Sequence, residues 1–123
     1  MLPILSVAMG GAFGALARYW LSSWLYNPGQ RLPLGTLTAN VLGSLVMGVL
    51  FVLILERAKL PPEMRLFLMT GFLGAFTTFS AFSLETVALI HEGHVMAAIF
   101  YVILSVMLSI AALAVAIWFT RLL

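Results

Sequence analysis

The sequence contains no cysteine and few charged residues. Without cysteine it can form no disulfide, no thiolate nucleophile and no cysteine-based metal or iron-sulfur site. Charged residues make up only 8% of the 123 residues, and the net charge of +2 is too small an excess to form a basic surface for nucleic acid. At 63% hydrophobic residues and a mean hydropathy of +1.16, the composition also excludes an ordinary soluble domain. The chain is therefore expected to be an integral membrane protein.

Four apolar stretches dominate the chain, near residues 3–25, 34–55, 66–90 and 96–119. Each approaches or exceeds the roughly 20 residues that a helix needs to cross about 30 Å of hydrocarbon. No Lys or Arg precedes the first stretch, so we interpret it as a retained span and not as a signal peptide. The sequence predicts an all-α fold, a single domain of four transmembrane helices over residues 1–123.

The basic residues indicate an orientation. An even number of spans places both termini and the second loop on the same side of the membrane. That side would hold Arg57, Lys59, Arg65 and Arg121, and the other side Arg31 with Arg18. Because basic residues concentrate on the cytoplasmic side, this distribution favours cytoplasmic termini.

Small or polar residues recur every four positions in the second and fourth spans, so in each helix they lie along one face. They are Thr36, Asn40, Ser44 and Gly48 in the second span, and Tyr101, Ser105 and Ser109 in the fourth. An unpartnered amide in hydrocarbon costs roughly 2 to 7 kcal/mol, so Asn40 must face another helix, a cavity or an ion pathway. Hydroxyls and amides donate hydrogen bonds without carrying charge, which suits an anion shedding water. Close helix packing is the other interpretation of the serines.

The third span contains the segment GFLGAFTTFSAF, residues 71–82. If the helix is continuous, four phenylalanines share one face, and small or polar residues share the other. The first set is Phe72, Phe76, Phe79 and Phe82, and the second is Thr70, Gly74, Thr77, Ala81 and Glu85. The stripe could serve lipid contact or packing, and phenyl ring edges could also contact an anion. The TTFS sequence after two glycines further predicts a break in this helix, where freed backbone groups could bind an ion.

Two charged residues fall within the predicted spans. Arg18 follows Gly10 and Gly14 in steps of four, and such small residues let another helix approach closely. A cation at this depth must find water, a carboxylate or backbone carbonyls. Arg18 could therefore snorkel to the membrane interface or have a functional role, and both interpretations are open. Glu85 is the only acid within a span, and pairing with Arg18 or facing a wet vestibule are both open.

The sequence contains no arrangement typical of an enzyme. His91 and His94 share a short loop, but two histidines without a third ligand are a weak metal signal. We interpret them as exposed loop residues. No thiol is present, and no histidine lies in a span to activate a serine, so we do not expect catalysis.

Three sequence blocks together resemble a known family. They are GGAFGALARY (10–19), PLGTLTANVLGSLVMG (33–48) and GFLGAFTTFSAF (71–82), each on its own span. In this order they are similar to the signatures of the CrcB or Fluc fluoride channel family, over about three of the four spans. The resemblance implies an antiparallel, dual-topology homodimer in the bacterial inner membrane. Such a dimer passes fluoride out of the cytoplasm passively and protects the cell from it.

The resemblance also implies roles for individual residues. The fluoride pathway would be lined by Asn40, Phe79, Phe82, Ser80, Thr36, Tyr101, Ser105 and Ser109. A buried structural sodium ion (Na+) at the dimer centre would be held by the backbone carbonyls of Gly74 and Thr77. Arg18 corresponds to the family's first-span arginine, and Glu85 to an acid near the pore entrance. The chain departs from many relatives at Ala81, where they have threonine, so it lacks a hydroxyl there.

Two other functions remain open from the residues. A small four-helix multidrug antiporter has similar length, but it exchanges protons for cationic drugs through an acid in its first span. Here that span holds Arg18 and no acid. A non-transporting packing subunit of a larger complex would need only the glycine stripes, and it leaves Asn40 and the hydroxyl tracks unexplained.

Overall fold

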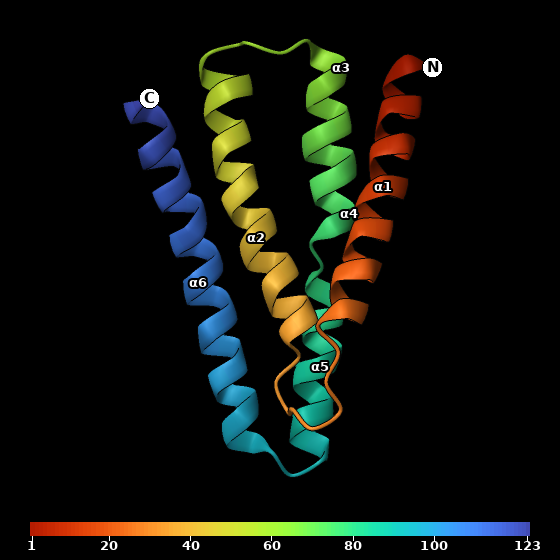
Figure 1. Ribbon diagram of the computed structural model, residues 1–123, viewed down its shortest axis with the longest axis vertical. Coiled ribbons are helices and arrows are strands. Elements are labelled where there is room, and N and C mark those ends of the chain that lie inside the picture. Colours follow the sequence, from red (N-terminus) through yellow and green to blue (C-terminus); the bar gives the residue numbers. More distant parts are fainter.

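Four helices long and apolar enough to cross a membrane follow one another along the chain: Leu2–Trp24, Leu34–Glu56, Pro62–His91 and Val95–Leu122. They are seen in a computed structural model that describes residues 1–123 (Figure 1). The elements are α1 (Leu2–Trp24), α2 (Leu34–Leu50), the π-helix η1 (Phe51–Glu56), α3 (Pro62–Arg65), the π-helix η2 (Leu66–Leu73), α4 (Gly74–Phe76), α5 (Phe79–His91) and α6 (Val95–Leu122). The prediction of an all-helical membrane fold with four spans is confirmed.

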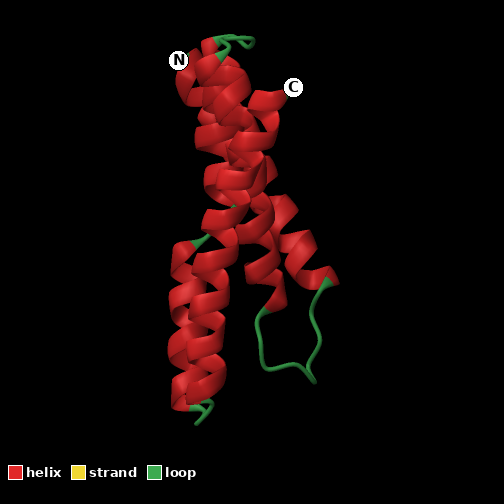
Figure 2. Cartoon of the chain, turned by 90° about the vertical axis from the view of Figure 1, so that its left-hand side faces the viewer, coloured by secondary structure: helices red, strands yellow, loops and turns green.

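Both chain ends lie at the same end of the molecule as the connection between η1 and α3 (Figure 1). The loop after α1 and the turn between α5 and α6 lie at the opposite end. The turn between α5 and α6 is tight because Gly93 adopts a φ of 84°, a conformation that residues with a Cβ rarely accept. The two halves of the fold separate toward this end, where one helix pair is joined by the short turn and the other by the longer loop (Figure 2).

Glycines bring α1 against the first half of the third span. A Cβ built on Gly10 would lie 2.1 Å from the Phe67 carbonyl oxygen, and one on Gly14 would lie 2.1 Å from that of Phe72. Only a residue without a side chain fits there, so the two main chains touch, as the small-residue spacing predicts. The other principal contact joins α2 to α6.

The third span is broken after α4. Thr77 has φ −89° and ψ 155°, and Thr78 has φ −152° and ψ 118°, so both residues are extended. The predicted break is therefore present. The continuous phenylalanine face was a wrong prediction, because the break separates its two halves. Phe72 and Phe76 stack on each other with centroids 5.9 Å apart, on the other side of the break from Phe79.

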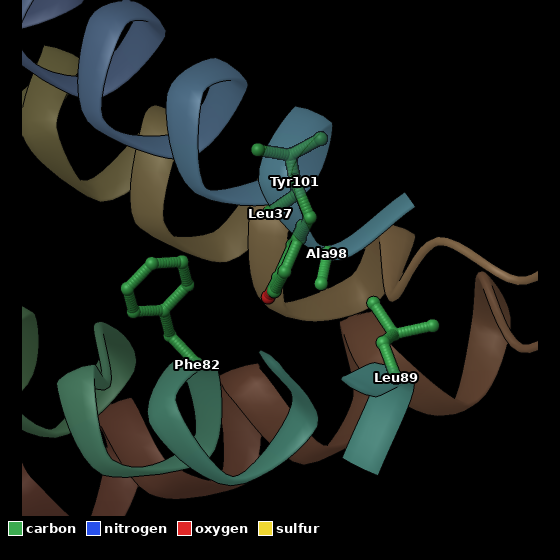
Figure 3. Packing of buried hydrophobic residues seen from close by; sticks show 5 residues of the cluster. All are labelled: Leu37, Phe82, Leu89, Ala98 and Tyr101. Atoms are coloured by element: carbon green, nitrogen blue, oxygen red, sulfur yellow. The ribbon is translucent and has the colours of Figure 1, made fainter. Parts of the chain in front are cut away.

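A small hydrophobic cluster joins the second, third and fourth spans. Figure 3 shows its members, which are Leu37, Phe82, Leu89, Ala98 and Tyr101. A second cluster contains Ala39, Leu73 and Phe76. Only 19 of the 123 residues are buried, so most of the apolar side chains must be covered by lipid or by another protein chain.

Polar contacts join η1 and the residue after it to the end of α6, at the end of the molecule that carries the termini. Arg57 donates hydrogen bonds from Nη2 to the carbonyl oxygens of Thr120 at 2.8 Å and of Arg121 at 3.3 Å. Arg121 in turn forms an ion pair with Glu56. The last carbonyls of α6 are thereby satisfied by a cation, which the negative end of a helix favours.

Candidate functional site

Asn40 spans the break in the third span. Its Nδ2 donates to the carbonyl of Thr78 at 3.1 Å, and its Oδ1 accepts from the N–H of Thr78 at 2.8 Å. The amide therefore replaces both helical hydrogen bonds that Thr78 would have made. Because Nδ2 carries two hydrogens, one remains available for another acceptor.

The break leaves main-chain carbonyls without partners. The helix ends at Phe76, and the N–H and hydroxyl of the next residue, Thr77, both donate to the carbonyl of Leu73, at 3.1 and 2.8 Å. No hydrogen bond reaches the carbonyls of Gly74, Phe76 and Thr77. Backbone groups at membrane depth require a partner, so these oxygens form a preorganised acceptor set.

The α5 helix begins immediately after the break. The hydroxyl of Thr78 caps it by accepting from the N–H of Ala81 at 3.1 Å. The N–H groups of Phe79 and Ser80 have no hydrogen-bond partner, so they remain exposed at the positive end of the helix. Ala81 thus contributes its main chain to the cap, and its missing hydroxyl does not affect that contact.

A groove of about 430 Å³ runs beside the break. It is lined by α2, by the break and start of α5, and by α6. Of the predicted pathway residues it contains Asn40, Phe79, Phe82, Ser105 and Ser109, and it also contains Thr77, which was predicted to hold a cation. Residues from three spans and far apart in sequence therefore meet at one surface.

Three aromatic rings follow one another from the groove into the core. The ring centroids of Phe79 and Phe82 lie 5.5 Å apart at 54°, and those of Phe82 and Tyr101 lie 5.2 Å apart at 51°. Phe79 is 78% exposed, whereas Phe82 is 9% exposed and Tyr101 is fully buried. Both pairs are tilted, the kind of arrangement that lets the partly positive edge of one ring approach the face of its neighbour.

Two hydroxyls next to the groove have no partner. Tyr101 Oη and Ser105 Oγ are buried and make no hydrogen bond, although buried hydroxyls in proteins are nearly always paired. Ser105 lies on the groove wall. Of these two hydroxyls, that of Ser105 is the one positioned to donate a hydrogen bond into the groove.

A second, polar hollow of about 270 Å³ lies at the end with the α1–α2 loop and is lined in part by Thr36 and Glu85. The Thr36 hydroxyl donates to Glu85 Oε1 at 2.7 Å. Glu85 lines this hollow and does not pair with Arg18, since the one ion pair in the chain joins Glu56 and Arg121. Thr36 therefore lies at this hollow and outside the groove lining.

Three other predicted residues also lie outside the groove lining. Ser80 is exposed, and its hydroxyl lies 3.3 Å from that of Thr78. Gly74 lies in the helix before the break, and the side chain of Arg18 binds the carbonyl of the next residue, Ala75. Tyr101 reaches the site through its packing against Phe82.

Sequence reasoning missed two residues of the site. Thr78 is the N-cap of α5 and the partner of Asn40, and a threonine three residues before the capped N–H is a signal that could have revealed it. Gly43 lines the groove, and a Cβ there would lie 2.3 Å from the Thr77 methyl. Its close approach to the break depends on how α2 crosses the third span, which the sequence does not specify.

The fold and the groove define a class: a small multi-pass membrane protein with a broken span and neutral donors beside the break. Residues 5–117 match the family described as "CrcB-like protein, Camphor Resistance (CrcB)". The chain belongs to this family, so the resemblance inferred from the three sequence blocks is confirmed.

Curated relatives cover nearly the whole chain. A protein from Saccharophagus degradans named "Fluoride-specific ion channel FluC" is 55% identical over 119 residues, which are 95% of this chain and 88% of the relative. Proteins of the same name are 44% identical in Hahella chejuensis, over 94% of this chain and 92% of the relative, and 49% identical in Rhizobium leguminosarum, over 91% and 90%.

Proposed function

We propose that this protein is a passive fluoride channel of the bacterial inner membrane, without enzymatic activity, which lets fluoride leave the cytoplasm and so reduces its toxicity. The observation that carries the proposal is the groove. It gathers neutral donors and phenyl edges in a chain whose curated relatives are named fluoride-specific ion channels.

The chemistry of the groove suits a small anion that must give up tightly held water. The free hydrogen of the Asn40 amide, the hydroxyls of Ser105 and Ser109, and the edges of Phe79 and Phe82 offer partial positive charge. None of these groups carries a full charge, so an anion is attracted without being trapped, as conduction requires. The hollow at Thr36 and Glu85 would be its water-filled entrance.

The working unit in this proposal is an antiparallel, dual-topology homodimer. The groove is open along one side, and little of the chain is buried. A second copy related by a two-fold axis would cover this side and would give two equivalent pathways. Interfaces between membrane helices depend on close packing and polar contacts, both of which the surface at the break can provide.

A sodium ion at the centre of such a dimer fits the groups at the break. Hard cations bind oxygen ligands, and the carbonyls of Gly74 and Thr77 accept no hydrogen bond within the chain. Two carbonyls from each copy would make a neutral four-oxygen set. In this arrangement the ion would hold the two copies together, and the anion would pass through the separate groove.

Fluoride efflux from liposomes tests the proposed function. Purified protein is reconstituted with internal potassium fluoride, and a potassium ionophore is then added to remove the voltage that opposes efflux. We expect rapid fluoride release, and little chloride release from matched chloride-loaded vesicles. Absence of fluoride release from vesicles that contain folded, inserted protein would refute the channel.

A cysteine-labelling experiment tests the topology separately. Because the chain has no cysteine, Lys59→Cys places a single thiol in the exposed connection after η1. Dual topology predicts that an impermeant reagent labels about half of these thiols from either side of the membrane. Labelling of nearly all of them from one side would refute dual topology and leave the efflux result standing.

A further inference from the structure

Arg18 reaches the break because of the glycines that precede it on α1. Gly10, Gly14 and Arg18 are spaced by four, so they lie along one helix face. The two glycines place the α1 main chain in contact with that of η2. Arg18 is the next residue on this line, and it lies where the third span ends its first half-helix.

The guanidinium binds the end of that half-helix through its inner nitrogen. Nε of Arg18 donates to the carbonyl of Ala75 at 3.1 Å. Ala75 lies between Gly74 and Phe76, whose carbonyls have no partner. The C-terminal end of a helix carries partial negative charge, so a cation is favourable there.

Asn40 binds the other end of the break, through both groups of its amide at Thr78. The extended segment is therefore held from two sides, by a residue of α1 and by a residue of α2. Successive peptide carbonyls in a helix turn by about 100°, so the Ala75 carbonyl faces a different direction from that of Gly74. Arg18 thus fixes the backbone without occupying the oxygens proposed for the cation.

We propose that Arg18 is a positioning residue for the break. By holding the Ala75 carbonyl, it fixes the direction of the Gly74 and Thr77 carbonyls, and so sets the affinity of the central cation site. This inference rests on the proposed function, because it assigns Arg18 to the sodium site of the channel. In this proposal Arg18 acts on the main chain of the break, through Ala75, and it does not line the groove.

Hydrogen exchange at the break, measured by mass spectrometry in detergent, tests the proposal. Arg18→Leu removes the donor, and Arg18→Gln keeps a shorter neutral donor. Arg65→Gln is the matched control because the side chain of Arg65 is exposed and forms no hydrogen bond or ion pair in the chain. We expect Arg18→Leu to speed exchange about tenfold at the hydrogen-bonded amides of Thr77, Thr78 and Ala81, Arg18→Gln to speed it less, and the control to leave it unchanged.

The dependence on sodium separates positioning from a general loss of stability. The same exchange is measured across sodium concentrations, with N-methylglucamine replacing the ion. In Arg18→Gln the sodium concentration that half-protects residues 77–81 should rise about tenfold, while exchange in α6 stays as in the wild type. If Arg18→Leu does not fold, Arg18→Gln decides the question alone.

Two results would overturn the inference. One is an equal exchange rate at residues 77–81 in Arg18→Gln and in the wild type, when both are measured without sodium. The other is an unchanged half-protecting sodium concentration in that variant. Failure of the proposed function would appear differently, as absence of fluoride release by the wild type, and the exchange comparison in sodium-free buffer would still decide whether Arg18 holds the break.

Discussion

Asn40 and Thr78 form a two-point hydrogen-bond pair that joins the second span to the break in the third. The distances are 3.1 Å from Nδ2 to the Thr78 carbonyl and 2.8 Å from the Thr78 N–H to Oδ1. One side chain therefore both shapes the break and presents a donor to the groove. Its substitution should affect structure and transport together.

Asn40→Asp should lower fluoride flux at least tenfold. The carboxylate can still accept the Thr78 N–H, but it cannot donate to the carbonyl, which then has no partner at a cost of about 1–3 kcal/mol. It also adds negative charge to the anion groove. Flux is measured by liposome efflux, and dimer formation by size-exclusion chromatography. A flux equal to that of the wild type would show that Asn40 does not line the pathway.

Thr78→Ala should destabilise the protein by about 1 kcal/mol, because α5 loses the side-chain cap at Ala81. Thr78→Ser keeps the hydroxyl and is the matched control. Thermal unfolding in detergent measures the difference. Equal midpoints for the two variants would show that the cap contributes nothing to stability.

Phe79→Ile should reduce fluoride flux without preventing folding. The ring is 78% exposed, so its removal leaves no cavity in the core, but it removes an aromatic ring from the groove lining. Phe100→Ile is the control, since that residue is 53% exposed on α6 and lies outside the groove. If both variants reduce flux equally, the loss reflects the substitution type and not the position.

Gly14→Ala should destabilise the fold by about 1–3 kcal/mol, the usual cost of overpacking. The new methyl would lie 2.1 Å from the main-chain oxygen of Phe72, which cannot move aside as a flexible side chain can. Gly11→Ala is the internal control, because its nearest neighbour would be the Gly71 oxygen at 3.9 Å. Thermal midpoints of the two variants should therefore differ. Equal midpoints would show that α1 can move away from η2 at little cost.

The sequence was sufficient for the features that depend on composition and local pattern. Hydropathy predicted four spans, and two threonines after a glycine-containing segment predicted the break in the third. The family emerged from short motifs. These features can be predicted without knowing how the helices pack, because the hydrocarbon core directly constrains the length and polarity of each span.

What the sequence could not specify depended on how the spans cross. The phenylalanine stripe assumed one continuous helix, whereas the break places Phe76 in a different cluster from Phe82. Glu85 could have paired with Arg18, but the path of α2 brings Thr36 to it instead. Which atoms Asn40 binds likewise follows from the position of α2 beside the break, and no residue pattern states it.

The break also bears on how such a span can enter the membrane at all. Recognition by the insertion machinery depends on the apolar character of an unfolded segment, and a charge near its centre is costly. In residues 66–84 there is no charged side chain, so the segment inserts as hydrophobic chain. In the folded span Thr77 and Thr78 are extended, which leaves peptide groups of the break outside the helical hydrogen bonds. The groups proposed to bind ions at the break are thus peptide groups freed by the fold, and no charged side chain of residues 66–84 is needed to supply them.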